Sequence, residues 1–552
     1  MKTFALLLAA ASVPSAAAQP ADPASEVDAL FKQWSAPTSP GCAVTVSRDG
    51  KVLLQRGYGQ ASVEAGVANG PQTEFHLASV SKQFTAFAVL LLQAEGKLST
   101  RDDVRKYVPE LHAFAQPITI DHLLHHSSGL RDQISLLWLQ GRRGEDTVTQ
   151  EDALRVIFDQ RELNFAPGQA FGYSNSNYTL LALIVERVSG KRFADFLAER
   201  VFAPLGMTHT YVVDDFRRIR AGEASPYGIG DDKKFERRIL AYSTVGSTDI
   251  RSSVEDLARW AANFRQPRVG TPAVIAEMLK GDPLTRYGGG LTIGRYRGVA
   301  VAEHSGLDPG FVTHFMVMPD QQFATAVLCN VELGDPVTFA RKIADIYLAG
   351  TLQAEAQRSP VTVPEAELQR VVGTYRDVGG MLLLVQLRDG KLFMQGGDPM
   401  LPHGGGEFAS TYAPVTFRFS GETPARTLTV VQPGGDMVAT RYEKRPAEAL
   451  TTARMADYLG DYYSPELGAI VTVERRKDEL WLKGPGYATR IQQPPPEFRE
   501  QDAFHTESVF GAIRFRRDAK GRVIELTSSN GRVVQVRFLR VEALPKLDAD
   551  KG

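Results

Sequence analysis

The chain has 552 residues, which is too long for a single hydrophobic core and predicts two to four domains. Apolar residues make up 43% of the sequence and charged residues 23%, a balance typical of soluble globular proteins. The 63 basic and 64 acidic residues give a formal charge of −1, so the composition does not favour nucleic acid or an anionic membrane as a partner.

The N-terminus has the pattern of an export signal. Lys2 supplies the positive start, Phe4 to Ala11 form an apolar core, and Ala16-Ala17-Ala18 form a small-residue cleavage site. We therefore expect residues 1–18 to be a signal peptide and the mature protein to be periplasmic or secreted; a buried N-terminal helix is the alternative. No later window has the roughly 18 uncharged apolar residues that a spanning helix needs, so no membrane span is expected.

Residues 24–352 read as one domain with strands at both ends and helices in the middle. The predicted strands are Cys42–Ser47, Lys51–Gly57, Gly289–Arg295, Val299–Ala302, Phe311–Met318 and Phe323–Asn330. The predicted helices include one up to about Pro40, one from Ser79 to near Gly96, Thr119–His125, one from Thr149, Tyr178–Val188, Phe193–Phe202, one from Ser252 through Trp260, and Pro336–Leu348. This order implies an α+β fold, in which one antiparallel sheet is built from both ends of the segment and covered by helices.

Two cysteines occur in this domain, Cys42 and Cys329, both in strand-like runs. So few cysteines exclude a disulfide scaffold and a cysteine-based metal site. Two separate buried thiols are the favoured interpretation, and a single disulfide in an oxidising compartment is the alternative.

After a linker from Thr351 to Glu367, the sequence changes to short alternating strands that repeat. Val372-Gly373-Thr374-Tyr375 matches Leu459-Gly460-Asp461-Tyr462, and Arg388 to Met394 matches Arg476 to Leu482. We expect two small antiparallel β-barrels or sandwiches, at residues 366–446 and 452–545. Neither copy carries a catalytic constellation.

The residues with the clearest chemistry are Ser79 and Lys82, at the start of a helical apolar run. Residues three apart lie on one helix face, so the amine can reach the hydroxyl. A serine needs a nearby base to become a nucleophile, and a lysine removed from bulk water can lose its proton near neutrality. A capping serine followed by a surface lysine is the alternative.

Two further stretches add polar groups. Tyr173 and Asn175 lie in a loop just before a helix, where a phenol can carry a proton and an amide can hold the lysine or a substrate carbonyl. His304-Ser305-Gly306-Leu307 is predicted between two strands, where Gly306 permits a close backbone approach and the Leu307 N–H suits an oxyanion hole. A polar turn with a core tyrosine, and a Gly/Pro turn with a surface histidine, are the alternatives.

His122, His125 and His126 invite a zinc site. The H-E-x-x-H arrangement with its general-base glutamate is absent, so packing beside Gly129 is the favoured interpretation. We predict no metal and no cofactor.

These motifs together resemble those of the penicillin-recognising serine hydrolases. Ser79-Val80-Ser81-Lys82, Tyr173-Ser174-Asn175 and His304-Ser305-Gly306 occur in the order and at the approximate separations of that superfamily, which includes class C β-lactamases, D,D-peptidases, esterases and D-aminopeptidases. The similarity covers roughly residues 40 to 330. One such domain followed by two small lipocalin-like barrels resembles the architecture of D-aminopeptidases.

The resemblance implies a β-lactamase-like or penicillin-binding-protein-like catalytic domain that forms an acyl-enzyme on Ser79. It implies that Lys82 and Tyr173 share the proton transfer, and that the Ser79 and Leu307 N–H groups bind the oxyanion. Asn175, His304, Ser305 and Gly306 would then contact the substrate. The expected substrates are small peptides, amides or esters, with an aminopeptidase or D-peptidase activity favoured and a β-lactamase-like or esterase activity as alternatives.

One departure from the superfamily pattern matters. His304-Ser305-Gly306 stands where many β-lactamases carry Lys-Thr-Gly, and loss of that lysine weakens the usual clamp on a substrate carboxylate. A hypothesis from another class is a non-catalytic protein that binds peptidoglycan or peptides, against which the intact Ser79, Lys82 and Tyr173 argue.

Overall fold

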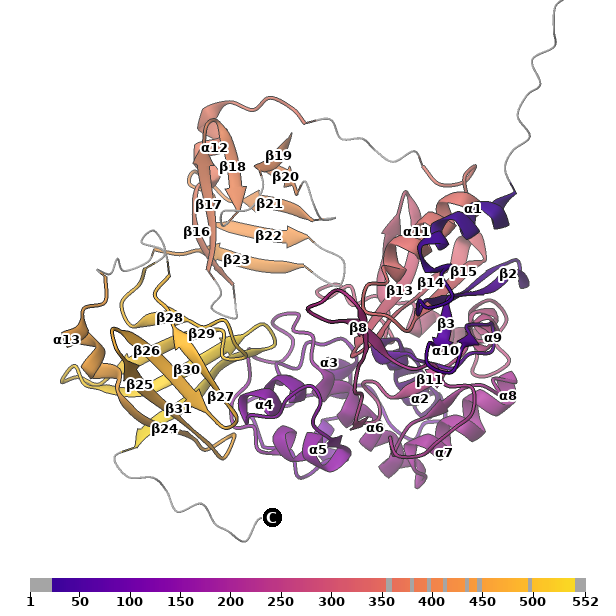
Figure 1. The fold of residues 1–552 in the computed structure, drawn as a ribbon, viewed down its shortest axis with the longest axis horizontal. Coiled ribbons are helices and arrows are strands. Elements are labelled where there is room, and N and C mark those ends of the chain that lie inside the picture. The colour runs from indigo at the N-terminus through magenta and orange to yellow at the C-terminus, as the bar shows by residue number, and fades with distance from the viewer. Residues whose placement is uncertain are drawn as a thin grey trace, which may run out of the picture.

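A computed structural model describes residues 22–353, 360–377, 382–394, 399–410, 415–431, 436–443, 449–494 and 499–541. The predicted signal peptide lies outside these residues. The described chain forms a mixed N-terminal domain, a closed barrel and a second eight-stranded sheet (Figure 1). Among the described helices, none combines the length and the apolar character needed to cross a membrane.

The N-terminal domain is organised around one six-stranded sheet with the order β12-β13-β14-β15-β1-β2. All neighbouring strands pair antiparallel. The strands are β1 (Cys42–Arg48), β2 (Lys51–Tyr58), β12 (Thr292–Tyr296), β13 (Val299–Asp308), β14 (Phe311–Met318) and β15 (Phe323–Cys329). The two ends of the domain meet where β1 pairs with β15, so the predicted α+β fold is confirmed.

Helices cover both faces of this sheet. On one face, α1 (Pro23–Leu30) and α11 (Pro336–Tyr347) pack on a core that includes Val44, Met316 and Phe339. The other face carries the larger helical layer: α2 (Lys82–Ala94), α3 (Ile120–Leu124), α4 (Gln133–Leu139), α5 (Gln150–Phe158), α6 (Asn175–Ser189), α7 (Phe193–Leu197), α8 (Ala203–Leu205), α9 (Val254–Arg265) and α10 (Pro272–Met278). In this layer α2 is buried along nearly its whole length, which gives its first turn a fixed position.

Helix starts follow from side chains that accept otherwise unpaired N–H groups. The Thr149 hydroxyl accepts the Asp152 N–H at 3.1 Å, and the Asp152 carboxylate accepts the Thr149 N–H in return. This reciprocal pair is the capping box at the predicted start of α5. Short strands complete the domain: β3 (Gln60–Ser62), β4 (Val67–Ala68), β5 (Phe75–His76), β6 (Val148–Thr149), β7 (Tyr211–Val212), β8 (Tyr227–Ile229), β9 (Phe235–Arg237), β10 (Tyr242–Ser243) and β11 (Ile250–Ser252).

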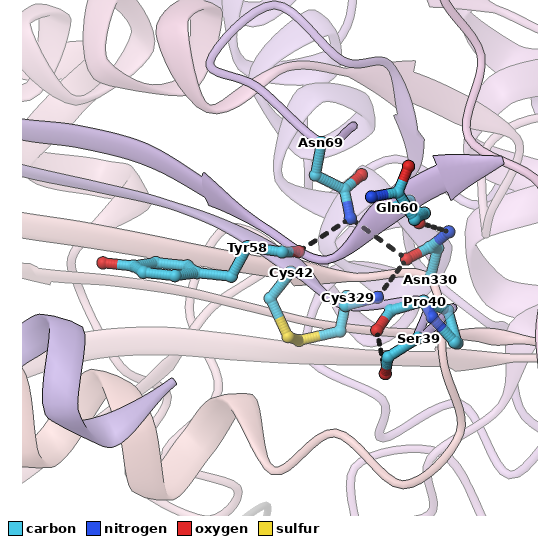
Figure 2. Close-up of a disulfide and its surroundings, with 9 residues drawn as sticks. Ser39, Pro40, Cys42, Tyr58, Gln60, Asn69, Cys329 and Asn330 are labelled. Atoms are coloured by element: carbon cyan, nitrogen blue, oxygen red, sulfur yellow. Dashed lines mark hydrogen bonds between the residues drawn. A yellow bond between two sulfur atoms is a disulfide. The ribbon is translucent and has the colours of Figure 1, made fainter. Parts of the chain in front are cut away.

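Cys42 and Cys329 are joined by a disulfide across the β1–β15 pair (Figure 2). The favoured expectation of two separate thiols is therefore wrong. The two cysteines are direct cross-strand partners, a register that the sequence does not reveal. Next to the disulfide, the amide oxygen of Asn330 accepts hydrogen bonds from the Gly41 N–H at 2.9 Å and from Asn69 at 3.4 Å.

The C-terminal region contains two eight-stranded units, as the sequence repeat predicts. The first is a closed barrel of β16 (Gly373–Asp377), β17 (Leu382–Arg388), β18 (Lys391–Met394), β19 (Pro399–Gly404), β20 (Glu407–Ala409), β21 (Thr416–Ser420), β22 (Thr427–Val431) and β23 (Met437–Arg441). The second is a sheet of β24 (Gly460–Ser464), β25 (Ala469–Arg476), β26 (Glu479–Gly484), β27 (Tyr487–Ile491), β28 (Ala503–His505), β29 (Ala512–Arg517), β30 (Val523–Asn530) and β31 (Val533–Val541). Each begins after a short helix, α12 (Glu365–Val371) and α13 (Thr452–Met455).

The repeat also has the same hydrogen bond in both copies. Tyr375 donates its hydroxyl to the carbonyl of Val371 at 2.9 Å, and Tyr462 donates to the carbonyl of Tyr458 at 2.7 Å. In each case the phenol satisfies a backbone acceptor four residues earlier, which explains why the same tyrosine occurs in both copies.

The second β-unit packs directly on the N-terminal domain beside α4 and α5 (Figure 1). One continuous apolar core contains Leu136 and Leu139 from α4 together with Tyr462 and Phe510 from the β-unit. The buried guanidinium of Arg131 donates two hydrogen bonds to Glu466, at 2.9 and 2.6 Å, and another to the carbonyl of Val534 at 3.0 Å. This shared core and ion pair fix the β-unit against the cleft described next.

Candidate active site

Ser79 lies in a 3₁₀ turn, Ala78–Ser81, that leads directly into α2. The sequence predicts Ser79 inside the first turn of the α-helix, whereas the α-helix begins at Lys82. Ala78 has a φ of +48°, in the left-handed region that non-glycine residues rarely adopt. Such a conformation costs on the order of 1 kcal/mol and persists where surrounding packing holds it, which is common beside reactive groups.

Lys82 is fully buried, and its amine contacts three oxygen atoms. Nζ lies 3.1 Å from the Ser79 hydroxyl, 2.8 Å from the amide oxygen of Asn175 and 2.8 Å from the carbonyl of Ser247. Burial, with a further contribution from the positive charge of Arg532, lowers the pKa of Lys82 to about 7. A neutral amine has two N–H donors and one lone pair. When the two N–H groups donate to the oxygens of Asn175 and Ser247, the lone pair is left to accept the Ser79 proton.

Tyr173 lines the same cleft as Ser79, and the Ser79 side chain is among the groups that act on its phenol. The Lys82 amine is 4.9 Å from the centre of its ring. Burial raises the pKa of Tyr173 well above its ordinary value, and the Ser79 side chain and the Arg532 charge only partly oppose this shift. The phenol therefore stays protonated near neutral pH, which suits a proton donor, whereas Lys82 is the group that can accept the first proton.

Asn175 is the first residue of α6, and its backbone N–H is held by the buried carboxylate of Asp132. Its N–H donates to the Asp132 carboxylate at 2.8 Å, which also accepts the Ile134 and Ser135 N–H groups at the start of α4. Asp132 therefore connects the first turns of α4 and α6 and holds the Asn175 side chain towards Lys82. The sequence gives Asp132 no role of this kind, because its partners come from two helices.

The stretch from His304 to Leu307 lies inside β13, not between two strands as the sequence predicts. The strand signal breaks at Ser305-Gly306, yet both residues pair in register with β14. A β-carbon on Gly306 would lie 2.3 Å from the Leu77 carbonyl oxygen and 2.3 Å from the Thr313 hydroxyl, so only glycine allows β13 to pass this close to the Ser79 turn. Beyond Glu303, β12 no longer pairs with β13, which leaves Leu307 on an edge among the described strands.

His304 is buried and uncharged. Burial and the adjacent Lys82 amine lower the pKa of His304 to about 3. Its Nδ1 lies 2.6 Å from the Ser305 carbonyl oxygen. Since a neutral imidazole that donates from Nδ1 presents an acceptor at Nε2, this side chain offers the cleft a lone pair and no positive charge.

The Ser305 side chain makes its contact elsewhere. Its hydroxyl lies 3.0 Å from Nδ1 of His314, whose Nε2 lies 3.2 Å from Glu303, and Glu303 also accepts a hydrogen bond from Arg341 at 2.8 Å. The structure therefore places the predicted substrate contact Ser305 in this separate hydrogen-bonded chain.

The three histidines considered as a zinc site, His122, His125 and His126, have other contacts. The ring of His122 accepts the Thr119 N–H at the start of α3, and His125 contacts the Asp121 carbonyl. Across the residues the structure describes, no group of three or more His, Cys, Asp and Glu side chains is placed to hold a metal ion. His126 instead stacks 4.3 Å from the Tyr173 ring, and burial keeps its pKa well below the ordinary value. An uncharged His126 imidazole therefore packs against the Tyr173 ring.

Ser79, Tyr173, Asn175, His304, Gly306 and Leu307 all line one cleft of about 2480 Å³. Both C-terminal units contribute to its walls, the barrel through residues such as Asp436 and the second β-unit through the β30–β31 hairpin. The hairpin residue Arg532 lies beside Tyr173, with its guanidinium carbon 4.9 Å from the ring centre. The Asn530-Gly531 pair predicts a hairpin turn there, but not that the turn enters the active site.

The arrangement of Ser79, Lys82 and Tyr173 in one domain can be compared with known proteins. The beta-lactamase family model matches residues 27–348, more than half of the chain. The chain belongs to the beta-lactamase family. As a member of this family, it carries its two β-units outside the matched region.

Protein flp of Staphylococcus aureus is 29% identical over 324 residues, which cover 53% of this beta-lactamase family chain and 60% of that protein. The chain thus spans less than two thirds of that relative. A D-aminopeptidase of Cereibacter sphaeroides is 28% identical over 482 residues, 83% of this chain and 87% of that protein. The octameric penicillin-binding protein homologue from Pyrococcus abyssi has the same fold over 75% of this chain and 99% of its own, with 24% identity and a TM-score of 0.56.

Proposed function

We propose that this protein is a serine hydrolase that forms an acyl-enzyme on Ser79 and cleaves small amide, peptide or ester substrates. The observation that carries the proposal is the buried Lys82 amine, 3.1 Å from the Ser79 hydroxyl and with a pKa of about 7. A lysine buried without an adjacent carboxylate is costly, and its loss of a proton near neutrality is the property that a general base needs.

In the acylation step, the Ser79 oxygen forms a bond to the substrate carbonyl carbon while its proton passes to the neutral Lys82 amine. The carbonyl oxygen gains the negative charge, and the backbone N–H groups of Ser79 and Leu307 bind it. When the tetrahedral intermediate collapses, the bond to the leaving nitrogen or oxygen breaks. Tyr173 donates a proton to that atom, and the Lys82 ammonium replaces the proton on the phenol.

Hydrolysis of the acyl-enzyme uses the same groups in reverse. A water molecule gives a proton to the base formed by Lys82 and Tyr173, attacks the acyl carbon, and releases Ser79 with its proton restored. His304 and Asn175 hold the substrate through an imidazole lone pair and an amide, neither of which carries charge.

The substrate class that we favour is a D-amino acid amide or short D-peptide. Similarity to proteins named D-aminopeptidase over 83% of the chain supports this choice. Both β-units also contribute walls to the cleft that holds Ser79, and added walls favour short substrates over long ones. An esterase or β-lactamase-like activity is the alternative, and the neutral His304 does not itself bind the carboxylate of a β-lactam.

A panel of D- and L-amino acid amides, p-nitrophenyl esters and nitrocefin tests the proposal. We expect turnover of D-configured amides, and loss of all turnover in Ser79→Ala. If wild-type protein turns over none of these substrates and does not react with a fluorophosphonate probe, the protein is better described as a non-catalytic peptide-binding member of the family.

We also propose a periplasmic or secreted location. The N-terminal signal pattern supports it. The Cys42–Cys329 disulfide is a second support, since disulfides persist in oxidising compartments. Fractionation of cells that express the full chain, with N-terminal sequencing of the mature protein, tests the location.

A further inference from the structure

The β30–β31 hairpin places one cation in the candidate active site. The backbone of Arg532 at its tip is fixed by the N-terminal domain, because the Arg532 carbonyl accepts hydrogen bonds from Asn164 at 3.0 Å and from the Asp132 N–H at 3.4 Å. The Asn164 amide oxygen also accepts the Val534 N–H at 2.8 Å. The tip is thus held on both sides, and the direction in which Arg532 leaves the backbone is defined.

The guanidinium group of Arg532 is half exposed in the cleft and has unused donors. It stacks 4.9 Å from the Tyr173 ring centre, and its nearest carboxylate oxygen, on Asp132, is 3.9 Å away. That distance is too long for a hydrogen bond. Within the described ranges, no protein atom accepts a hydrogen bond from this guanidinium, although every arginine offers five N–H donors.

The carboxylate of Asp132 is already occupied. It accepts three backbone N–H groups, from Ile134, Ser135 and Asn175. The ring against which Arg532 packs belongs to the neutral Tyr173 phenol, and the Lys82 amine near the same ring is not an anion either. The hairpin therefore presents an unsatisfied planar cation to the cleft beside Ser79.

We propose that Arg532 is a specificity residue that binds a carboxylate carried by the substrate. This inference rests on the proposed function and narrows its substrate class from D-amino acid amides and short D-peptides to the short D-peptides, whose C-terminal carboxylate is free and lies near the scissile bond. The arginine fork matches a carboxylate with two parallel hydrogen bonds. It supplies from the last β-unit the positive charge that His304-Ser305-Gly306 lacks, and it disfavours an α-ammonium group at the same place.

The first test measures binding without turnover. In Ser79→Ala protein, titration calorimetry compares N-acetyl-D-alanine, a carboxylate, with N-acetyl-D-alaninamide, its neutral isostere. Because hydrogen bonds to charged groups contribute roughly 1.5–3 kcal/mol, we expect the carboxylate to bind about 10- to 100-fold tighter. Adding Arg532→Gln should remove this difference. Equal binding of the two ligands before that change, or an unchanged ratio after it, would overturn the proposal.

The second test measures turnover by protein that retains Ser79. The substrates are an N-acetylated D-dipeptide with a free C-terminus, the C-terminal amide of the same dipeptide, and D-alaninamide. Arg532→Gln should lower kcat/KM for the free acid about 10- to 100-fold relative to kcat/KM for its C-terminal amide. The ratio of the two substrates within one variant is the readout, because the Arg532 charge also acts on the pKa of Lys82 and so on the turnover of every substrate. Arg532→Glu should favour the cationic D-alaninamide. Arg540→Gln is the matched control, because Arg540 lies in β31, the strand that follows the Arg532 turn, and donates to the carbonyls of Asp457 and Leu459 away from the cleft.

Different results would overturn the Arg532 assignment and the proposed function. If the ester is cleaved and the acid has no advantage over its amide, the Arg532 assignment is wrong and the proposed function stands. If no substrate is cleaved, the proposed function fails, and the calorimetric comparison still decides whether Arg532 binds a carboxylate.

Discussion

The amine of Lys82 lies 2.8 Å from the amide oxygen of Asn175, and this contact orients the base. The Ser247 carbonyl occupies a second N–H at the same distance. Since both acceptors persist when the amine is neutral, deprotonation frees only the lone pair that faces Ser79. The contact between Lys82 and Asn175 thus turns a buried lysine into a directed general base.

The pH dependence of catalysis should report this lysine. With a pKa of about 7, Lys82 is protonated and inactive at low pH and becomes competent as the pH rises. We expect kcat/KM for a neutral ester to rise with pH to a plateau, with an apparent pKa near 7. Lys82→Arg keeps the charge but cannot lose it at accessible pH, so it should lower kcat/KM at least about 1000-fold. The rate should be measured between roughly pH 5 and 9, about two units either side of the pKa of Lys82. A rate that does not change over this range, or near-normal turnover in Lys82→Arg, would contradict the role of Lys82 as a base.

The same lysine should make stability depend on pH. An unfolded lysine titrates near 10.5, whereas the buried one titrates near 7, so between these values the unfolded chain binds more protons and stability rises with pH. The Lys82→Met variant lacks this term. We expect the wild type to gain about 2–3 kcal/mol of unfolding free energy relative to Lys82→Met between roughly pH 6.5 and 9.5. Denaturant melts of both proteins at the two pH values give this difference. Parallel changes in the two proteins would show that Lys82 titrates normally.

The close approach of β13 to the Ser79 turn should not tolerate a side chain. Gly306→Ala would place a methyl group 2.3 Å from the Leu77 carbonyl oxygen and displace Leu307 from the nucleophile. We expect kcat to fall about 100-fold or more, because removal of one oxyanion donor has an effect of this size. Gly294→Ala on the neighbouring strand β12 is the control, since a β-carbon there meets no atom within 4 Å. Equal activity of the two variants would remove β13 from the oxyanion site.

Much of this site follows from local sequence. The pairing of Ser79 with Lys82 depends on a single turn, so the spacing alone predicts the 3.1 Å contact that the structure has. The place of Tyr173 just before a helix follows from the same kind of local pattern, although the helix begins at Asn175, three residues earlier than the predicted start at Tyr178. His304 to Leu307 were predicted outside a strand because Ser-Gly lowers strand propensity, and pairing with β14 overrides that preference.

Contacts between distant parts of the chain could not be predicted in this way. The Cys42–Cys329 pair depends on the register of β1 against β15. Arg532 reaches Tyr173 only because an entire β-unit docks on α4, and that docking depends on apolar packing and on Arg131, for which the sequence gives no partner.

The docked β-unit should detach when its buried ion pair is broken. Glu466 is one-tenth exposed, and Arg131 is buried, so Glu466→Ala leaves this arginine with only the more exposed Glu162 carboxylate, 3.6 Å away. We expect a loss of about 3–5 kcal/mol of unfolding free energy and faster proteolysis of the second β-unit. Asp518→Ala, which breaks the exposed pair with Arg522, is the control and should change stability by less than about 1 kcal/mol. Equal effects of the two variants would contradict a structural role for the Arg131–Glu466 pair.

Ser79 is the proposed nucleophile, and covalent labelling tests this role directly. The full chain is incubated with a fluorophosphonate at neutral pH, and intact mass and peptide mapping locate the adduct. We predict one adduct per chain on Ser79, none on Ser79→Ala, and unchanged labelling of Ser529→Ala, a serine in the same cleft whose hydroxyl accepts the Gln535 N–H at 2.9 Å. Labelling of Ser79→Ala at the wild-type level, or an adduct on another residue of the wild type, would contradict the account.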